Sequence, residues 1–269
     1  MSAAAAQLLE PVAAIARRAA QEILAVYGSG SFATTLKEDD SPLTRADTRA
    51  HALIAAALAE LTPQVPVLSE EGGTAAWAQR RLWTRYWLVD PLDGTREFLA
   101  RNGEFTVNIA LIEAHQPVLG VVHVPVQDTS YQGLPGSGAW RERAGGPREV
   151  LQVSAHSAAV VRVAGSRSHR GNSLESFLQR LGPHTLLSIG SALKFCLVAE
   201  GAADVYPRLG PTSEWDTAAA HAVTVGAGGR VLTLEGEPLR YNLRDSLLNP
   251  HFIAYGPGDR DWLALLAPL

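Results

Sequence analysis

The sequence contains a single cysteine, Cys196, which excludes an internal disulfide bond and any Cys-x-x-Cys motif for zinc or redox chemistry. This scarcity is typical of a protein from a reducing compartment, and we expect the Cys196 thiol to lie in the core. An EF-hand calcium loop is also absent, because no acidic stretch has the Asp-x-Asp-x-Asp-Gly spacing followed by the required glutamate.

Long apolar runs are missing as well. No uninterrupted run approaches the roughly 18 residues that a membrane-spanning helix needs. The alanine-rich start of the chain is interrupted by Glu10, Arg17 and Arg18 and has no basic residue before its apolar part, unlike a signal peptide. The apolar segment 263–268 is too short to insert into a bilayer, although peripheral attachment to the cytoplasmic face of an inner membrane stays open. We therefore expect a cytoplasmic globular protein.

Basic residues form no run or stripe, and the 269-residue chain has a formal net charge of -4. These features argue against a nucleic-acid polymer as partner, because such binding needs a basic face. Hydrophobic residues make up 46% of the chain and charged residues 19%, which is typical of a folded protein with a sizeable core. Composition does not decide between a monomer and a homodimer.

The first half, residues 1–155, has the pattern of an α+β unit. Apolar residues at steps of three and four predict a helix whose regular part runs from Pro11 to Gly28. A second helix is expected to open at Thr44 and to end before Pro63. Residues 104–158 alternate apolar and polar side chains between Gly and Pro turns, a pattern that predicts an antiparallel meander.

The second half, residues 156–269, alternates predicted strands with predicted helices and therefore has the pattern of an α/β unit. The helices are expected at residues 172–181, 191–201 and 215–225. We predict a boundary between the halves at residues 155–159.

Four acidic residues follow predicted apolar strands or begin a predicted helix. They are Glu70, Asp90, Asp93 and Asp216. Carboxylates brought together repel one another, so a divalent cation is the usual reason for such a cluster. Oxygen ligands without His or Cys favour Mg²⁺, with Mn²⁺ as a substitute, over zinc. Pro91 would fix the turn between two of them so that the Leu92 carbonyl faces the same ions.

Each of these residues alone also has a structural explanation. Asp93 and Gly94 are a common turn pair, Asp216 could cap the helix that follows it, and Glu70 could belong to an exposed acidic turn. The presence of all four at strand ends or a helix start favours a metal site over these separate structural roles. Gly94 and Thr95 then begin a predicted short helix whose N–H groups would bind a phosphate. The pattern predicts metal-dependent hydrolysis of a phosphate ester.

The segments SEEG, DPLDGTREF and WDTAAAHAV together resemble the signature of the inositol monophosphatase superfamily of lithium-sensitive, Mg²⁺-dependent phosphatases. The similarity spans almost the whole chain. It implies an α/β protein folded as a layered αβαβα sandwich, which binds two or three Mg²⁺ ions. More narrowly, DDSPLTRAD, GSRSH and YPRLGPTSEWDTAAAHAV look like the bacterial 3'(2'),5'-bisphosphate nucleotidases within that superfamily.

The resemblance also implies roles for individual residues. The metal ligands would be the four carboxylates and the Leu92 carbonyl. Asp47 with Thr95, and Glu70 through its metal, would orient and deprotonate the attacking water, whereas the residues alone predict a capping box from Thr44 to Asp47. The two roles can coexist. The implied substrate contacts are Glu70, Leu92, Asp93, Gly94, Thr95, Ser166, His169, Gly190, Ser191, Lys194 and Asp216.

The choice of substrate depends on the second half. A second phosphate held by Lys194 would favour a bisphosphorylated nucleotide over inositol monophosphate, whereas spacing alone equally allows an exposed Lys194 and a His169 that caps a turn. We expect hydrolysis of adenosine 3',5'-bisphosphate to AMP and phosphate, which the resemblance links to sulfate assimilation. An inositol or sugar-phosphate phosphatase and a nucleotide-sensing binding protein are the alternatives. An aspartyl-phosphate mechanism is disfavoured, because its motif has one residue fewer between the two aspartates.

Overall fold

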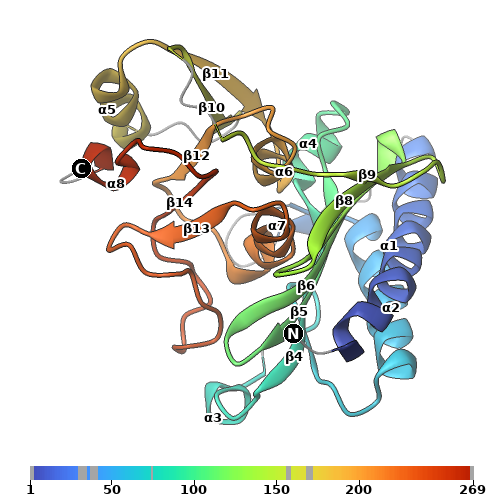
Figure 1. Cartoon of the computed structure of the whole chain (residues 1–269). Helices are drawn as coiled ribbons and strands as arrows, with labels where there is room; N and C mark the ends of the chain where they lie inside the picture. The colour runs from blue at the N-terminus through green and yellow to red at the C-terminus, as the bar shows by residue number, and fades with distance from the viewer. Residues whose placement is uncertain are drawn as a thin grey trace.

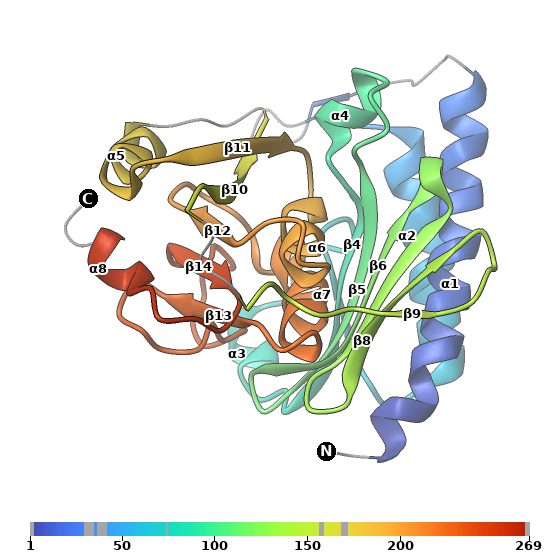
Figure 2. The same ribbon diagram turned by 45° about the horizontal axis from the view of Figure 1, so that its top comes forward.

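The computed structural model describes residues 3–29, 35–36, 42–73, 75–155, 159–167 and 172–266. Helices and sheets alternate in five layers, as Figure 2 shows from α1 and α2 at one side to α5 and α8 at the other. This arrangement confirms the predicted αβαβα sandwich. One outer layer consists of α1 (Ala3–Ser29) and α2 (Arg45–Leu61), and the central layer consists of α6 (Leu193–Ala199) and α7 (Glu214–Gly226) (Figure 1).

The larger sheet has seven strands in the order β3-β4-β5-β6-β7-β8-β9, and only β3 and β4 pair in parallel. The predicted antiparallel meander is confirmed from β5 onward. The strands are β3 (Val67–Ser69), β4 (Arg85–Asp93), β5 (Thr106–Glu113), β6 (Gln116–Val124), β7 (Thr129–Leu134), β8 (Gly138–Arg143) and β9 (Glu149–Val150). Three short helices, α3 (Trp77–Arg80), α4 (Thr95–Leu99) and the 3₁₀ turn Pro125–Gln127, and the strand pair β1 (Thr35–Leu36) and β2 (Pro42–Leu43) complete this half.

Both faces of this sheet are buried, which explains its strongly apolar strands. In β5, Val107 and Ile109 pack with residues of α1 and α2, whereas Ala110 and Ile112 pack with residues of α6 and α7. Alternate side chains of a strand point to opposite faces, so one strand serves two cores. Cys196 of α6 lies in the second of these cores, as predicted, with 1% of its surface exposed.

The smaller sheet has five strands in the order β11-β10-β12-β14-β13. β10 pairs in parallel with β11 and β12, and β14 pairs antiparallel with β12 and β13. The elements are β10 (Val161–Ser166), α5 (Asn172–Leu181), β11 (His184–Ile189), β12 (Val205–Arg208), β13 (Arg230–Thr233), β14 (Phe252–Tyr255) and α8 (Trp262–Leu266). The sequence analysis did not predict β13, β14 and α8, which are four or five residues long.

The predicted start of the first helix was wrong. α1 begins at Ala3, and Pro11 lies inside it. A proline at this position removes one backbone hydrogen bond. The buried stripe of α1, however, runs through the proline, with Leu9 before it and Val12 and Ala16 after it. Packing of this continuous stripe on the sheet keeps the helix intact across Pro11.

Two glycines let α7 approach the larger sheet closely. A Cβ atom at Gly120 of β6 would lie 2.1 Å from the Ala219 carbonyl oxygen, and one at Gly133 of β7 would lie 2.4 Å from the Val223 Cα atom. The helix backbone therefore rests directly on the strand backbones. This contact, in the second and third turns of α7, sets the position of the helix whose first turn carries Asp216.

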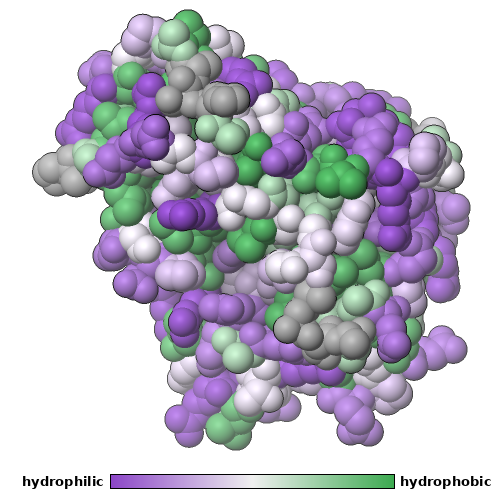
Figure 3. Space-filling view, in the orientation of Figure 1, coloured by the Kyte–Doolittle hydropathy of each residue, from purple (hydrophilic) through white to green (hydrophobic). Residues whose placement is uncertain are grey.

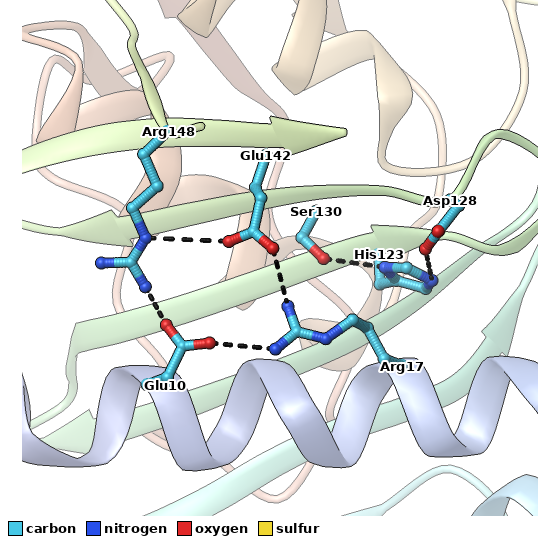
Figure 4. Close-up of polar contacts among 7 residues, drawn as sticks. All are labelled: Glu10, Arg17, His123, Asp128, Ser130, Glu142 and Arg148. Carbon is cyan, nitrogen blue, oxygen red and sulfur yellow. Dashed lines mark hydrogen bonds and ion pairs between the residues drawn. The ribbon is translucent and has the colours of Figure 1, made fainter. Parts of the chain in front are cut away.

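A ring of charged side chains joins α1 to the far edge of the larger sheet (Figure 4). Arg17 donates to Glu10 at 2.9 Å and to Glu142 at 3.4 Å, and Arg148 pairs with the same two carboxylates. These side chains are partly exposed, so each pair contributes at most about 1 kcal/mol. Beside Arg17 in Figure 4, His123 is buried and its Nδ1 lies 2.8 Å from Ser130 Oγ.

On the face drawn in Figure 3, hydrophilic and hydrophobic residues are interspersed. Within the described parts of the chain, no helix is both long and apolar enough to cross a membrane. In the sequence, the strands of the larger sheet come before the predicted boundary at residues 155–159 and those of the smaller sheet come after it. One buried core nevertheless contains residues of both sheets together with residues of α6 and α7. The division into two units therefore stays a prediction.

Candidate active site

Two neighbouring strands bring the first two carboxylates to the same end of the larger sheet. β3 and β4 run in parallel with Ser69 beside Val89, and the Glu70 N–H donates to the Val89 carbonyl at 3.1 Å. Glu70 directly follows the last residue of β3, and Asp90 follows Val89 within β4. The acidic ends that the sequence predicted for the strands are therefore adjacent in space.

A bulge in β4 brings the third carboxylate to the same side. Asp90 pairs with Asn108 of β5 and Asp93 pairs with Thr106, so β4 has one extra residue between the pairs. In a regular strand, residues three apart would face opposite sides. The bulge removes this opposition. Gly94 then adopts φ +92°, a left-handed conformation that favours glycine, and leads into α4.

The carboxylates of Asp90, Asp93 and Asp216 lie near one another, with Asp90 buried and the other two half-buried at the cavity. Burial raises the pKa of Asp90 well above its usual value, and repulsion by Glu70, Asp93 and Asp216 raises it further. Burial, followed by repulsion from Asp93 and Glu70, likewise raises the pKa of Asp216. The pKa of Asp93 is raised by burial too, although Lys194 opposes the shift. Glu70, Asp93 and Asp216, which come from three segments of the chain, thus all act on the ionisation of Asp90.

The chemistry of this donor set fits a hard divalent cation. All the donors are oxygens, and a cation between them would offset both the burial and the repulsion of the charges. As the side chains stand, however, no three acidic, histidine or cysteine residues in the described parts of the chain form a group able to hold a metal ion. Their assignment as metal ligands, together with the Leu92 carbonyl, therefore stays a prediction.

Asp47 lies beside the same turn. Its Oδ2 accepts from the Thr44 backbone N–H at 2.7 Å and from the Thr44 hydroxyl at 2.6 Å, which confirms the predicted capping box of α2. Its Oδ1 accepts from Thr95 Oγ1 at 3.4 Å. One oxygen of this buried carboxylate thus caps α2, and the other contacts Thr95. The resemblance implied that Asp47 acts together with Thr95.

A cavity of about 260 Å³ extends from the aspartates into the second half. Most of the predicted substrate contacts line it, from both halves: Asp93, Gly94, Thr95, Ser166, Gly190, Ser191, Lys194 and Asp216. Glu70 and Leu92 are not among its lining residues. His169 lies outside the described residues. The structure thus brings Ser166, Gly190, Ser191 and Lys194 to the same cavity as Asp93 and Asp216.

Lys194 is 6% exposed, so the alternative of a solvated lysine on a helix surface was wrong. Its ammonium group donates to the Ser191 carbonyl at 2.5 Å. Burial lowers the pKa of Lys194 to about 8, against the opposing effect of Asp93. The side chain therefore places a buried cationic donor beside the cavity.

The sequence analysis missed two polar residues of the site. Asn108 of β5 is buried and donates through Nδ2 to Asp93 Oδ2 at 3.2 Å. A lone asparagine in an otherwise apolar strand was the available signal. Arg208 at the end of β12 lines the cavity, and its Nε has no hydrogen-bond partner among the described residues. Arg208 belongs to the segment YPRLGPTSEWDTAAAHAV that carries the resemblance, but nothing in the local sequence indicated that its side chain faces the cavity.

The Asp216 carboxylate accepts from the Ser213 backbone N–H at 2.8 Å, so the predicted capping role is confirmed at the start of α7. The same residue lines the cavity and repels Asp93. As with Asp47, capping and proximity to the site coexist in one carboxylate.

Comparison with known proteins gives consistent results. Residues 5–264 match the inositol monophosphatase family. The protein named 3'(2'),5'-bisphosphate nucleotidase CysQ from Salmonella typhimurium is 52% identical over 246 residues, which cover 91% of this chain and 98% of that protein. The CysQ protein of Buchnera aphidicola is 41% identical over 251 residues, covering 92% of this chain and 93% of its own.

Solved structures extend the similarity to the whole fold. The crystal structure of CysQ from Bacteroides thetaiotaomicron is 42% identical, with a TM-score of 0.80, and the match covers 91% of this chain and 96% of that one. The extragenic suppressor protein SuhB from Bartonella henselae is 25% identical, with a TM-score of 0.81 and coverage of 98% of this chain and 100% of its own.

Proposed function

Because the chain belongs to the inositol monophosphatase family, we propose that it is a Mg²⁺-dependent 3'(2'),5'-bisphosphate nucleotidase that converts adenosine 3',5'-bisphosphate to AMP and phosphate. The observation that carries this choice is the composition of the cavity. It joins Asp93 and Asp216 of the acidic cluster to Lys194 and Arg208, two cationic side chains of the second half, and it is also lined by Arg96. A monophosphate needs only the metal end of such a cavity, whereas a second phosphate gives the two cations a partner.

The proposed metal ligands are Glu70, Asp90, Asp93, Asp216 and the Leu92 carbonyl. Their oxygen donors and burial support this assignment. Bound Mg²⁺ would neutralise charge on the phosphate oxygens and on the leaving oxygen. The number of ions is two or three in this proposal.

The attacking water would be oriented by Asp47 and Thr95. The 3.4 Å contact between Thr95 Oγ1 and Asp47 Oδ1 supports a shared role, because the hydroxyl can pass a proton to the carboxylate. The backbone N–H groups of Gly94 and Thr95 would hold the phosphate being removed. Water would attack the phosphorus directly, the ester bond to the ribose oxygen would break, and no phosphoenzyme would form.

A comparison of four substrates tests this function. With added Mg²⁺, we expect kcat/KM for adenosine 3',5'-bisphosphate to exceed that for adenosine 3'-monophosphate and for inositol 1-phosphate by at least about tenfold, a difference equal to one good charge-assisted contact. 5'-AMP should not be hydrolysed. A preference for inositol 1-phosphate would assign the chain to the monophosphatase alternative, and nucleotide binding without phosphate release would assign it to the sensor alternative.

Substitution of the cations sharpens the test. Lys194→Met and Arg208→Met should each reduce kcat/KM for the bisphosphate at least about tenfold, but should affect adenosine 3'-monophosphate much less. Equal losses for both substrates would place the two cations elsewhere than at the second phosphate.

A further inference from the structure

We propose that Glu104 is a positioning residue that holds the nucleotide side of the cavity in place against the metal side. This inference rests on the proposed function. Glu104 lies between α4 and β5, in the first half of the chain. Figure 2 shows this end of the larger sheet beside the connection from β11 to α6 in the second half. The Glu104 carboxylate crosses between the two.

The carboxylate binds two segments of the second half at once. Arg167, which follows β10, donates to it from Nε at 2.9 Å and from Nη2 at 2.6 Å. Gly190, which follows β11, donates its backbone N–H to Glu104 Oε2 at 2.9 Å. Arg167 Nη2 also donates to the Ser188 carbonyl at 2.9 Å, so the two segments are tied to each other as well.

These contacts hold a strained turn. Ser191 has φ +44°, a left-handed conformation that is unfavourable for a residue with a side chain. The residues on either side of it are anchored by carboxylates of the first half, because Gly190 donates to Glu104 and Ala192 donates to Asp93 at 2.6 Å. The Ser191 carbonyl accepts from Lys194 at 2.5 Å.

The strained residue itself has a free polar group. Ser191 Oγ is buried, lines the cavity and has no hydrogen-bond partner among the described residues. A buried hydroxyl without a partner is costly unless a ligand completes it. The strain and the unpaired hydroxyl together indicate that the turn is shaped for the substrate, and Glu104 is one of the two carboxylates that keep this shape.

The ion pair itself should contribute little to the stability of the protein. Arg167 is 49% exposed and Glu104 is 18% exposed, and pairs of this kind gain little from being formed in water. Loss of Glu104 should therefore displace the turn while leaving the free energy of unfolding nearly unchanged. This separates a positioning role from a merely structural one.

The first experiment compares Glu104→Ala with wild type on two substrates. We expect KM for adenosine 3',5'-bisphosphate to rise about tenfold, because a displaced turn loses the nucleotide contacts. The kcat/KM for p-nitrophenyl phosphate, which occupies only the metal side, should stay within about twofold, and so should the Mg²⁺ affinity measured by calorimetry. Glu104→Gln should be intermediate, because its amide oxygen can still accept from Gly190 while the charge toward Arg167 is lost.

Glu113→Ala is the matched control. Glu113 lies at the other end of β5 and pairs with Arg85 at 3.1 Å, with partial exposure of both side chains. The substitution removes a comparable ion pair whose residues do not line the cavity. The KM of this variant should therefore stay at the wild-type value.

A double variant tests whether Arg167 acts through Glu104. Arg167→Ala should raise KM on its own but add no further increase to Glu104→Ala. The inference fails if Glu104→Ala leaves the nucleotide KM unchanged, or if both substrates lose activity in parallel with a lowered Tm. A wild-type protein that does not hydrolyse the bisphosphate would instead refute the proposed function, whatever the variants do.

Discussion

The Asp93 carboxylate accepts a hydrogen bond of 2.6 Å from the Ala192 backbone N–H, across 99 positions of the sequence. The same oxygen, Oδ2, accepts from Asn108 Nδ2, so Oδ1 remains available for a cation. One side chain thus joins the proposed metal site to the turn at Ser191 in the second half. Occupation of the metal site should therefore affect nucleotide binding through Asp93.

Asp93→Asn should weaken Mg²⁺ binding and reduce kcat by at least about a hundredfold, because one charge of the cluster is lost and the new amide group faces the Ala192 N–H. Calorimetry with Mg²⁺ and phosphate-release assays measure the two effects. Asp259→Asn is the control, since Asp259 is exposed and does not line the cavity. Near-normal turnover of Asp93→Asn would contradict the proposed ligand set.

Asp47→Ala should lower both stability and activity. The capping box of α2 would be broken, at a cost of about 1 kcal/mol, and the contact with Thr95 would be lost. Thr44→Ala removes the cap hydroxyl but leaves the contact between Asp47 and Thr95. It should lower stability by a similar amount while kcat stays within about twofold. Urea unfolding and steady-state kinetics separate the roles, and equal kcat losses in both variants would argue against a catalytic Asp47.

Stability should fall between pH 7 and pH 5 partly because of His123. The pKa of His123 is lowered from 6.5 to about 4. Burial is the main cause, Asp128 opposes the shift, and Arg17 adds to it. The unfolded chain binds a proton at this residue below about pH 6.5, whereas the folded chain does not until about pH 4. The folded state is thus fully favoured above pH 6.5 and loses about 2 kcal/mol between pH 7 and pH 5 from this group.

The asparagine in His123→Asn should keep a hydrogen bond to Ser130 but cannot titrate. Between pH 7 and pH 5, the free energy of unfolding of this variant should therefore fall by about 2 kcal/mol less than that of the wild type. Urea unfolding at the two pH values measures the difference. A variant with the wild-type pH dependence would show that His123 is accessible to protons in the folded state.

Gly120→Ala and Gly133→Ala should each destabilise the protein by about 1 to 3 kcal/mol or more, because the added methyl group would meet the backbone of α7. Activity should fall too, since a displaced α7 carries Asp216 with it. Gly28→Ala is the control: a Cβ at Gly28 has no heavy atom within 4 Å. Unchanged urea midpoints for both sheet variants would mean that α7 does not rest on the strand backbones.

The sequence by itself was sufficient for the features that depend on near neighbours. Apolar periodicity predicted α2, α5 and α7, and alternation predicted the meander, because each pattern is set within one element. The spacing of Thr44 and Asp47 predicted the cap for the same reason. The carboxylates that follow strands were recognisable because strand ends meet at a sheet edge.

Only the tertiary structure decided the features that depend on distant partners. Spacing gave no indication that Lys194 is buried, that Asn108 contacts Asp93, or that Glu104 holds Gly190, a residue 86 positions away. Local rules placed Pro11 at the start of the first helix, yet the packing of α1 on the sheet continues the helix across it. Local patterns report propensities within a few residues, whereas these contacts arise from how seven strands, five strands and the helices between them pack together.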